Sequence, residues 1–134
     1  MHPTSLGSYD IVRALGEGAA GDVYLAKDRT TGREVALKVL RRTAPRELAR
    51  FLEEADAVRR LEHPNIVEVY ALEEIESSFC LSMRYVPGGS LATATAMTVR
   101  DALIAMRHVC LATQYAHTAG ILHLDLKPSN ILLD

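Results

Sequence analysis

The sequence predicts an α+β fold in which a mostly antiparallel sheet comes first and a helical part follows. Two observations support this prediction. Residues 9–86 contain five segments of strand-like composition and one segment with helical periodicity, and the break “PGGS” at residues 87–90 is followed by a second helical stretch. The 134 residues suffice for one domain with a real core.

Three strand segments precede the first helix. They are “YDIVRAL”, “DVYLAKD” and “EVALKVL”, separated by a glycine cluster and by the turn sequence “RTTGR”. Residues 1–8 are polar and contain Gly, Ser and Pro, so we expect a flexible lead-in before the domain, which begins at residue 9.

Residues 44–62 change to a helical period. Thr43 is placed as the N-cap and Pro45 suits the first turn, whereas “HPN” at residues 63–65 ends the helix. The apolar side chains that fall on one stripe are Leu48, Phe51, Leu52, Ala55 and Val58. This stripe predicts the face that packs on the sheet.

The remaining strands and a long helix follow. “IVEVYALEE” and “SFCLSMRYV” predict two strands around a turn near Glu76–Ser78. A helix is predicted over residues 98–118, with Thr98 as its cap and Gly120 as its C-terminal signal. Apolar residues surround much of its circumference, so we expect burial on several sides. A short extended segment, “ILHLDL”, and the loop “KPSNILLD” come last.

Charge and cysteine content narrow the functional classes. The net charge is −2, from 15 basic and 17 acidic side chains, which argues against a nucleic-acid or membrane-surface binder. Cys80 and Cys110 lie in apolar surroundings, so we expect reduced, buried residues. No apolar run reaches the ~18–20 residues of a membrane helix, and the start lacks a signal-peptide pattern. We therefore expect a cytoplasmic protein, with a membrane anchor downstream left open.

A glycine cluster joins the first two strands. “GEGAAGDV”, residues 16–23, fits G-x-G-x-x-G-x-V. Alone, the pattern is equally well explained by an ordinary hairpin turn. A dinucleotide-binding reading needs a helix straight after the glycines, but a strand follows here. Glycines in such a loop allow backbone N–H groups to approach phosphate oxygens.

A lysine stands among apolar neighbours in “VALK”, residues 35–38. Because strand side chains alternate, Ala36 and Lys38 share one face. One interpretation is a lysine at a sheet edge whose amine reaches solvent. The other is a buried cation that binds phosphate and pairs with a carboxylate. Glu54 borders the apolar stripe of the helix whereas Glu53 points outward, so Glu54 is the predicted partner, with a solvated helix-edge acid as the alternative.

Together these motifs resemble the eukaryotic-like (Hanks-type) Ser/Thr protein kinases. “GEGAAGDV”, “VALK”, “EEA”, “HPNIV”, “YVPGGSL” and “HLDLKPSN” occur in that family's order and spacing. The resemblance covers residues 9–134. It implies a five-stranded antiparallel N-lobe sheet with one helix over residues 9–86, and the start of a helical C-lobe over residues 87–134. It also implies ATP, Mg²⁺ and a protein substrate with a Ser or Thr hydroxyl.

The resemblance implies a nucleotide-binding role for eleven positions. They are Leu15, Gly16, Gly18, Gly21, Val23, Ala36, Lys38, Met83, Arg84, Val86 and Leu132. The glycines would close over the triphosphate, and Lys38, oriented by Glu54, would hold the α- and β-phosphates. Met83 falls at the gatekeeper position. Arg84 and Val86 would contact adenine through backbone groups.

The motif “HLDLKPSN” implies the catalytic roles. Asp125 would accept the proton of the substrate hydroxyl, Lys127 would steady the transferring phosphoryl group, and Asn130 would ligate Mg²⁺. His123 is interpreted as structural. Leu124 departs from the family, where an Arg normally pairs with a phosphate on the activation loop. We therefore expect a kinase that does not depend on that phosphorylation.

The sequence departs from the kinase family pattern in two further places. “ATATAM”, residues 92–97, replaces a longer helix and loop, so we expect a trimmed rim near the ribose. The sequence ends at Asp134, before any D-F-G, so we expect a fragment of a domain about twice as long, inactive alone and marginally stable or aggregation-prone. The alternative is a nucleotide-binding pseudokinase or scaffold module, which the presence or absence of a D-F-G would distinguish.

Overall fold

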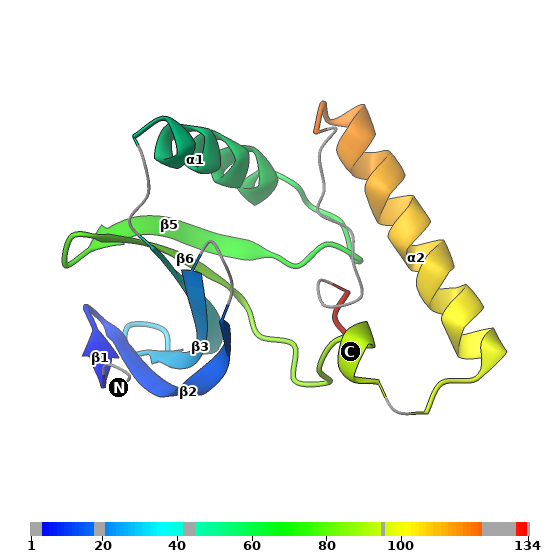
Figure 1. Ribbon diagram of the computed structural model, residues 1–134, viewed down its shortest axis with the longest axis horizontal. Helices are drawn as coiled ribbons and strands as arrows, with labels where there is room; N and C mark the ends of the chain where they lie inside the picture. Colours follow the sequence, from blue (N-terminus) through cyan, green and yellow to red (C-terminus); the bar gives the residue numbers. More distant parts are fainter. Residues whose placement is uncertain (1–3, 18–20, 42–44, 95, 122–130, 134) are drawn as a thin grey trace. The chain divides into compact units, whose positions relative to one another are not determined.

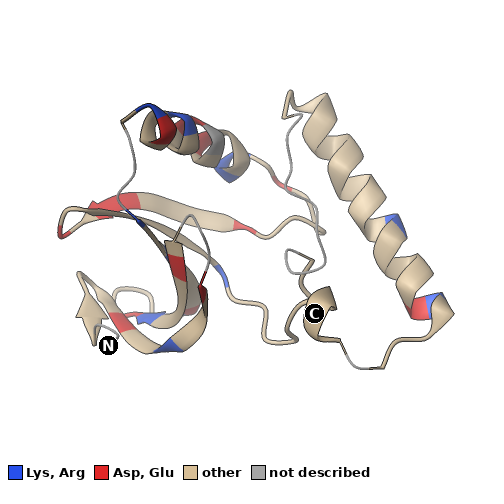
Figure 2. Cartoon of the chain, in the orientation of Figure 1, with Lys and Arg blue, Asp and Glu red and all other residues tan. Residues whose placement is uncertain are grey.

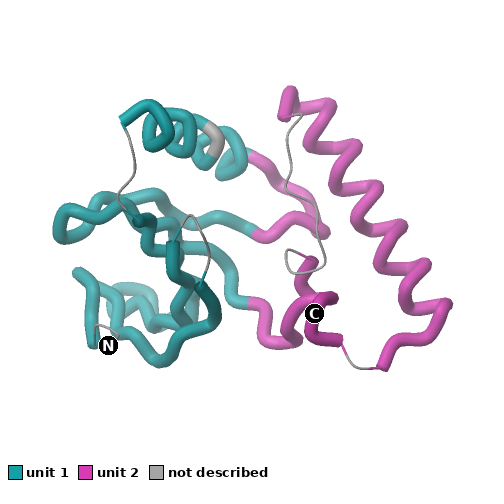
Figure 3. Tube along the Cα trace, in the orientation of Figure 1, with its two compact units in different colours: residues 1–60, 68–85 teal, residues 61–67, 86–134 magenta. Residues whose placement is uncertain are grey.

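The computed structural model describes residues 4–17, 21–41, 45–94, 96–121 and 131–133, without the side chain of Glu54. The chain divides into two compact units, shown in different colours in Figure 3. Unit 1 comprises Met1–Arg60 and Glu68–Tyr85, and unit 2 comprises Leu61–Val67 and Val86–Asp134. Unit 1 holds the sheet and the first helix, and unit 2 holds the second.

Unit 1 is built on a six-stranded antiparallel sheet with the order β1-β2-β3-β4-β6-β5 (Figure 1). Its strands are β1 (Ser5–Leu6), β2 (Tyr9–Glu17), β3 (Gly21–Asp28), β4 (Glu34–Leu40), β5 (Val69–Ile75) and β6 (Ser78–Arg84). The five predicted strands are confirmed. The additional strand, β1, lies within residues 1–8, where the composition predicted a lead-in without regular structure.

The strand β1 exists because one of its residues belongs to the core. Leu6 is 8% exposed and packs in the buried cluster of unit 1. The buried members of this cluster are Leu6, Tyr9, Ala26, Val35, Leu37 and Cys80. Val35 and Leu37 alternate along β4 and so point to the same face of the sheet, as predicted. Full burial of such a side chain stabilises a fold by about 1.5–3 kcal/mol.

The turn between β1 and β2 lies close to the end of β5. Gly7, between β1 and β2, has a φ of +54°, and a Cβ at this position would lie 3.0 Å from the Ile75 side chain at the end of β5. Since β1 and β5 are the two edge strands, this approach places the turn after one edge strand beside the end of the other.

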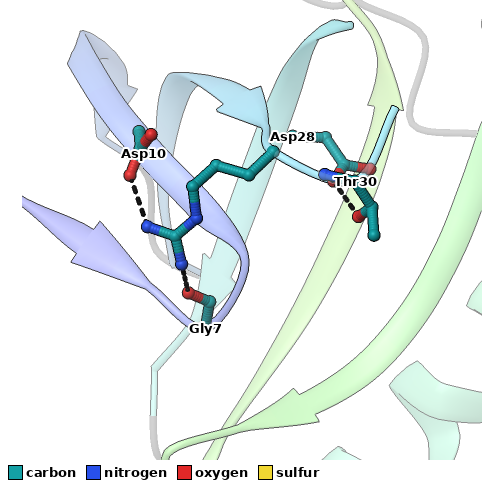
Figure 4. A network of polar contacts seen from close by, with 5 residues as sticks. Gly7, Asp10, Asp28 and Thr30 are labelled. Atoms are coloured by element: carbon teal, nitrogen blue, oxygen red, sulfur yellow. Dashed lines mark hydrogen bonds and ion pairs between the residues drawn. The ribbon is translucent and has the colours of Figure 1, made fainter. Parts of the chain in front are cut away.

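Arg29 ties the β1–β2 turn to the β3–β4 turn. It donates to the Gly7 carbonyl and to the Asp10 carboxylate, the latter at 2.8 Å. Next to it, the Thr30 backbone N–H donates to the Asp28 carboxylate at 2.9 Å, a turn-stabilising bond (Figure 4). These contacts keep the two turns at a fixed spacing.

The helix α1 (Pro45–Arg59) confirms the helical segment predicted over residues 44–62. Its apolar stripe packs toward the sheet: Ala55 is 7% exposed, and α1 contacts β5. Charges of both signs lie along it (Figure 2), and Asp56 accepts hydrogen bonds from Arg59 and Arg60 at 2.6 and 2.9 Å. The predicted N-cap, Thr43, lies outside the described residues.

The helix α2 (Val99–Thr118) has both of its predicted ends. The Thr98 side chain accepts a hydrogen bond from the Asp101 backbone N–H at 3.1 Å, which caps the first turn. Gly120 has a φ of +88°, and its N–H donates to the His117 carbonyl at 3.0 Å. None of the helices among the described residues is long and apolar enough to cross a bilayer.

Several large apolar side chains of α2 are exposed, so the burial on several sides that the sequence predicts is not found in this chain. The exposed side chains are Val99, Leu103, Ile104, Met106 and Leu111, whereas Ala112 and Ala116 are buried. Cys110 is exposed as well, so the prediction that both cysteines are buried is correct for Cys80 and wrong for Cys110. Its position explains the difference, because Cys110 follows Leu103 and Met106 at helical spacing and shares their exposed side.

Candidate functional site

Two rows of side chains cross the centre of the sheet on one face. In the first row, Lys38 of β4 lies between Val23 of β3 and Leu81 of β6. Residues that pair directly across antiparallel strands point to the same side of the sheet. Because Lys38 alternates with Leu37, which belongs to the core cluster, this side is opposite to that cluster. We call it the site face.

The second row runs parallel to the first. Ala36 lies between Leu25 and Met83, again in direct cross-strand register. Ala36 is 8% and Leu25 6% exposed, whereas Met83 is half-buried, so most of this row is closed to water. The structure thus brings Val23, Ala36, Lys38 and Met83 together on the site face, all of them predicted nucleotide-binding positions.

Sequence reasoning missed two members of the site face. Leu25 follows Val23 by two residues along β3, and Leu81 precedes Met83 by two residues along β6. Both are buried. The period-2 alternation of strands would have placed them on the same side as their neighbours.

Lys38 occupies a central strand. Because β4 lies between β3 and β6, the interpretation of Lys38 as a sheet-edge lysine is wrong. Its side chain is half-buried, and its Nζ atom lies 5.8 Å from the centroid of the Phe51 ring on α1. The side chain of the predicted partner, Glu54, lies outside the described part of the structure.

The glycine motif lies in the β2–β3 hairpin. Antiparallel pairing of Gly16 with Val23 confirms that a strand follows the glycines, so a strand–helix dinucleotide motif is excluded. A Cβ at Gly16 would have no neighbour within 4 Å, whereas one at Gly21 would lie 2.1 Å from the Val39 carbonyl oxygen. Leu15 is exposed beside them, and Gly18 lies outside the described residues.

The segment that leaves β6 carries the predicted backbone contacts. The Arg84 N–H donates to the Glu68 carbonyl at 2.8 Å, so this amide already has a partner in the chain. A main-chain contact from Arg84 to a ligand would therefore have to use its carbonyl oxygen. The Tyr85 hydroxyl accepts a hydrogen bond from Arg13 at 3.0 Å. Val86 follows it, is half-buried and belongs to unit 2.

Within unit 2, residues 131–133 run beside the segment that follows β6. Leu132 forms a bridge with Ser90, and the Leu133 N–H donates to the Gly89 carbonyl at 2.8 Å. The Leu132 side chain is 40% exposed. The 3-10 turn η1 (Leu91–Thr93) follows, and residues 96–98 have no regular structure.

The motif “HLDLKPSN”, with its predicted catalytic positions, belongs to a stretch that the structure does not describe. Asp125, Lys127, Asn130, His123 and Leu124 all fall within residues 122–130, so their predicted roles stay predictions. Elsewhere in the described chain, no three His, Cys, Asp or Glu side chains gather as a possible metal site.

The site face suits an adenine nucleotide in its chemistry. Its apolar side chains provide a surface for a flat base, and the one cation between them, Lys38, provides charge for phosphate. The hairpin next to it carries glycines where backbone N–H groups can approach an anion.

Comparisons with known proteins identify the type of domain. A family model described as the protein kinase domain matches residues 9–134. The serine/threonine-protein kinase PknJ of Mycobacterium tuberculosis is 41% identical over 98% of this chain, and PrkC of Bacillus subtilis is 39% identical over 96%. The chain spans 24% and 21% of the lengths of these two relatives.

Solved structures agree on the fold. The crystal structure of the M. tuberculosis PknI kinase domain matches 96% of this chain with a TM-score of 0.79 and 33% sequence identity, and the match covers 55% of that structure. This similarity confirms the predicted kinase-like α+β fold.

Proposed function

Because this chain belongs to the protein kinase domain family, we propose that the full-length protein transfers the γ-phosphoryl group of ATP to Ser or Thr hydroxyls of proteins. The observation that supports the proposal most is the place of Lys38, a cation on a buried apolar face between Val23 and Leu81. The choice of acceptor is supported by the relatives, whose names describe serine/threonine-protein kinases.

In the proposed complex the adenine base contacts the apolar side chains of the site face. Val23 and Ala36 cover the base, with Met83 at the back, and Leu132 stays a predicted adenine contact. Lys38 neutralises charge on the α- and β-phosphates and is oriented by Glu54. These groups act by positioning and charge neutralisation, from which phosphoryl transfer gains most.

The proposed reaction is an in-line displacement at the γ-phosphorus. The acceptor oxygen forms a bond to phosphorus while the bond to the β–γ bridging oxygen breaks, and ADP leaves. Asp125 orients the hydroxyl and accepts its proton, and Lys127 stabilises the charge of the transferring group. Asn130 is the proposed ligand in this chain for Mg²⁺, which neutralises phosphate charge when bound.

The test uses the full-length protein and two substitutions. Asp125→Asn should lower the turnover number about 10²–10⁴-fold, the usual effect of a positioned base, with ATP binding retained. Lys38→Arg should weaken ATP binding, whereas Lys27→Arg, a matched change at an exposed lysine of β3, should not. Transfer of labelled phosphate to a general protein substrate gives the rates. Near-normal turnover of Asp125→Asn contradicts the mechanism, and nucleotide binding without transfer by the wild type favours the pseudokinase.

The proposal includes independence from activation-loop phosphorylation. Leu124 stands where the family has an Arg that pairs with the loop phosphate, and leucine cannot form this pair. Phosphatase treatment of the full-length protein should leave its transfer rate unchanged. A large loss of rate after phosphatase treatment would show that another group binds the phosphate.

A further inference from the structure

Lys38 has an aromatic neighbour that the sequence did not reveal. Its Nζ atom lies 5.8 Å from the ring centroid of Phe51, within the ~6 Å range of a cation–π interaction. Phe51 belongs to the apolar stripe of α1, the helix that packs against β5. The contact therefore joins a helix and a central strand at the charged group of the site face.

The two cross-strand neighbours of Lys38 offer its ammonium group no hydrogen bond. Its cross-strand partners on the site face are Val23 and Leu81, whose side chains have no hydrogen-bond acceptor. The lysine is half-buried, so part of its hydration is lost. Among the side chains that the structure describes, the Phe51 ring lies close to the ammonium group. Its attraction for the charge can offset this loss of hydration.

A ring and a carboxylate hold an ammonium in different ways. A carboxylate accepts N–H hydrogen bonds, so it occupies some of the three donors of the amine. The face of a ring attracts the charge through its quadrupole and takes no directed hydrogen bond. An ammonium held by Phe51 therefore keeps its N–H donors available for phosphate oxygens.

We propose that Phe51 is a positioning residue for Lys38. The ring keeps the ammonium on the site face before the nucleotide arrives, so less side-chain freedom is lost when the phosphates bind. This inference rests on the proposed function, because it assumes that Lys38 receives phosphate. Phe51 itself touches neither the nucleotide nor the reacting atoms in this proposal.

The first experiment detects the contact without measuring activity. Lysines of the full-length protein are labelled by reductive ¹³C-methylation, and the Lys38 resonance is assigned by its loss in Lys38→Arg. A methyl group above an aromatic ring should resonate upfield of the exposed Lys27. Phe51→Leu should remove this displacement. The matched control is Phe79→Leu, which removes the other phenylalanine of the chain and should leave the resonance in place.

The second experiment separates ring electrostatics from packing. Replacing the Phe51 ring by its pentafluoro analogue keeps the shape of the side chain but removes the negative face of the ring. The KM for ATP should rise about two- to fivefold with kcat little changed, the effect of one cation–π contact. This isosteric change also covers the case in which Phe51→Leu fails to fold. Phe79→Leu should leave the KM unchanged.

The outcomes distinguish the two proposals. If the wild-type Lys38 resonance does not move when ATP is added, the proposed function is wrong. If it moves, but the Phe51 variants change neither the resonance nor the KM beyond the Phe79→Leu control, only the role of Phe51 is wrong. The role of Phe51 is supported if the Lys38 resonance lies upfield in the wild type, if Phe51→Leu removes this displacement, and if both Phe51 variants raise the KM for ATP.

Discussion

Gly16 and Gly21 belong to one glycine motif but serve different physical needs. At Gly16 a side chain would meet open space, so its need for glycine comes from the ligand that the motif is proposed to bind. At Gly21 a Cβ would lie 2.1 Å from the Val39 carbonyl oxygen, because β4 passes directly beside it. Of these two glycines, Gly21 is therefore required by the packing of the sheet itself.

We expect Gly21→Ala to destabilise the protein and Gly16→Ala to leave its stability nearly unchanged. The added methyl at position 21 must push β3 away from β4, a shift that costs roughly 1–3 kcal/mol of the free energy of unfolding. Urea denaturation of the two variants measures the difference. Equal stabilities would show that the β3–β4 hairpin adjusts without cost. ATP affinity, in contrast, should fall in Gly16→Ala even though its fold is intact.

The two cysteines should react differently. Burial raises the pKa of Cys80 from 9.0 to about 11, and the side chain is 1% exposed, whereas Cys110 is exposed. A thiol reagent at neutral pH should label Cys110 quickly and Cys80 only when the protein unfolds. Rapid labelling of both thiols in the folded protein would contradict the buried position of Cys80.

The raised pKa of Cys80 also predicts a pH dependence of stability. The folded state keeps the thiol protonated up to about pH 11, whereas the unfolded chain releases the proton near pH 9.0. The contribution of Cys80 is thus complete below pH 9 and decreases by an amount on the order of 2–3 kcal/mol as the pH rises to about 11. Cys80→Ala should lose less stability over this range. Burial raises the pKa of Tyr9 as well, in the same direction, so some decrease should remain.

Among the elements, the β5–β6 hairpin contains backbone strain that its sequence does not relieve. Glu76 and Ser77 have φ angles of +49° and +68°, between the paired residues Ile75 and Ser78. Such a two-residue turn favours Asn-Gly, because most other side chains are strained at positive φ. The register of the two strands, rather than the turn residues, therefore determines this turn.

Replacing Glu76-Ser77 by Asn-Gly should stabilise the protein by roughly 1 kcal/mol. The gain comes from the loss of strain at two positive φ angles, and the midpoint of urea unfolding measures it. Ser77→Ala alone is the control, since alanine is strained at the same φ. If the double substitution has no more effect than this control, the turn geometry is not what limits the stability of the hairpin.

At the scale of the whole molecule, the exposed apolar side of α2 is the main liability of this chain. Val99 and Leu103 are 78% and 66% exposed, and three further large apolar side chains of the helix are exposed as well. Apolar surface left in water carries a free-energy cost of about 25 cal/mol per Å². The expectation that the isolated 134 residues are marginally stable or aggregation-prone follows from this surface.

We expect the isolated chain to bind a hydrophobic dye and to aggregate as its concentration rises. Leu103→Gln should reduce both effects without lowering the free energy of unfolding, because the side chain is already mostly in water. Leu37→Gln, at a fully buried position, is the contrasting change and should unfold unit 1. A sharp, reversible melt of the unmodified chain with no dye binding would contradict the prediction.

The features that the sequence predicts follow from rules that act within a few residues. The alternation of side chains along residues 34–40 separated Ala36 and Lys38 from the core residues, and helical periodicity with Thr98 and Gly120 fixed the long helix at both ends. These features depend on residues close in sequence. The kinase motifs are local as well, since each is a short string at a fixed spacing.

The sequence by itself therefore determined five strands, the two α-helices, their order and the type of domain, because periodicity, capping and motif spacing are encoded within a few residues. The tertiary structure decided the strand β1, the neighbours Leu25 and Leu81, the exposure of Cys110 and the ring of Phe51 above Lys38. Each of these depends on strand register or on packing between elements far apart in the chain. Such contacts form only when the sheet and its helix bring distant residues together.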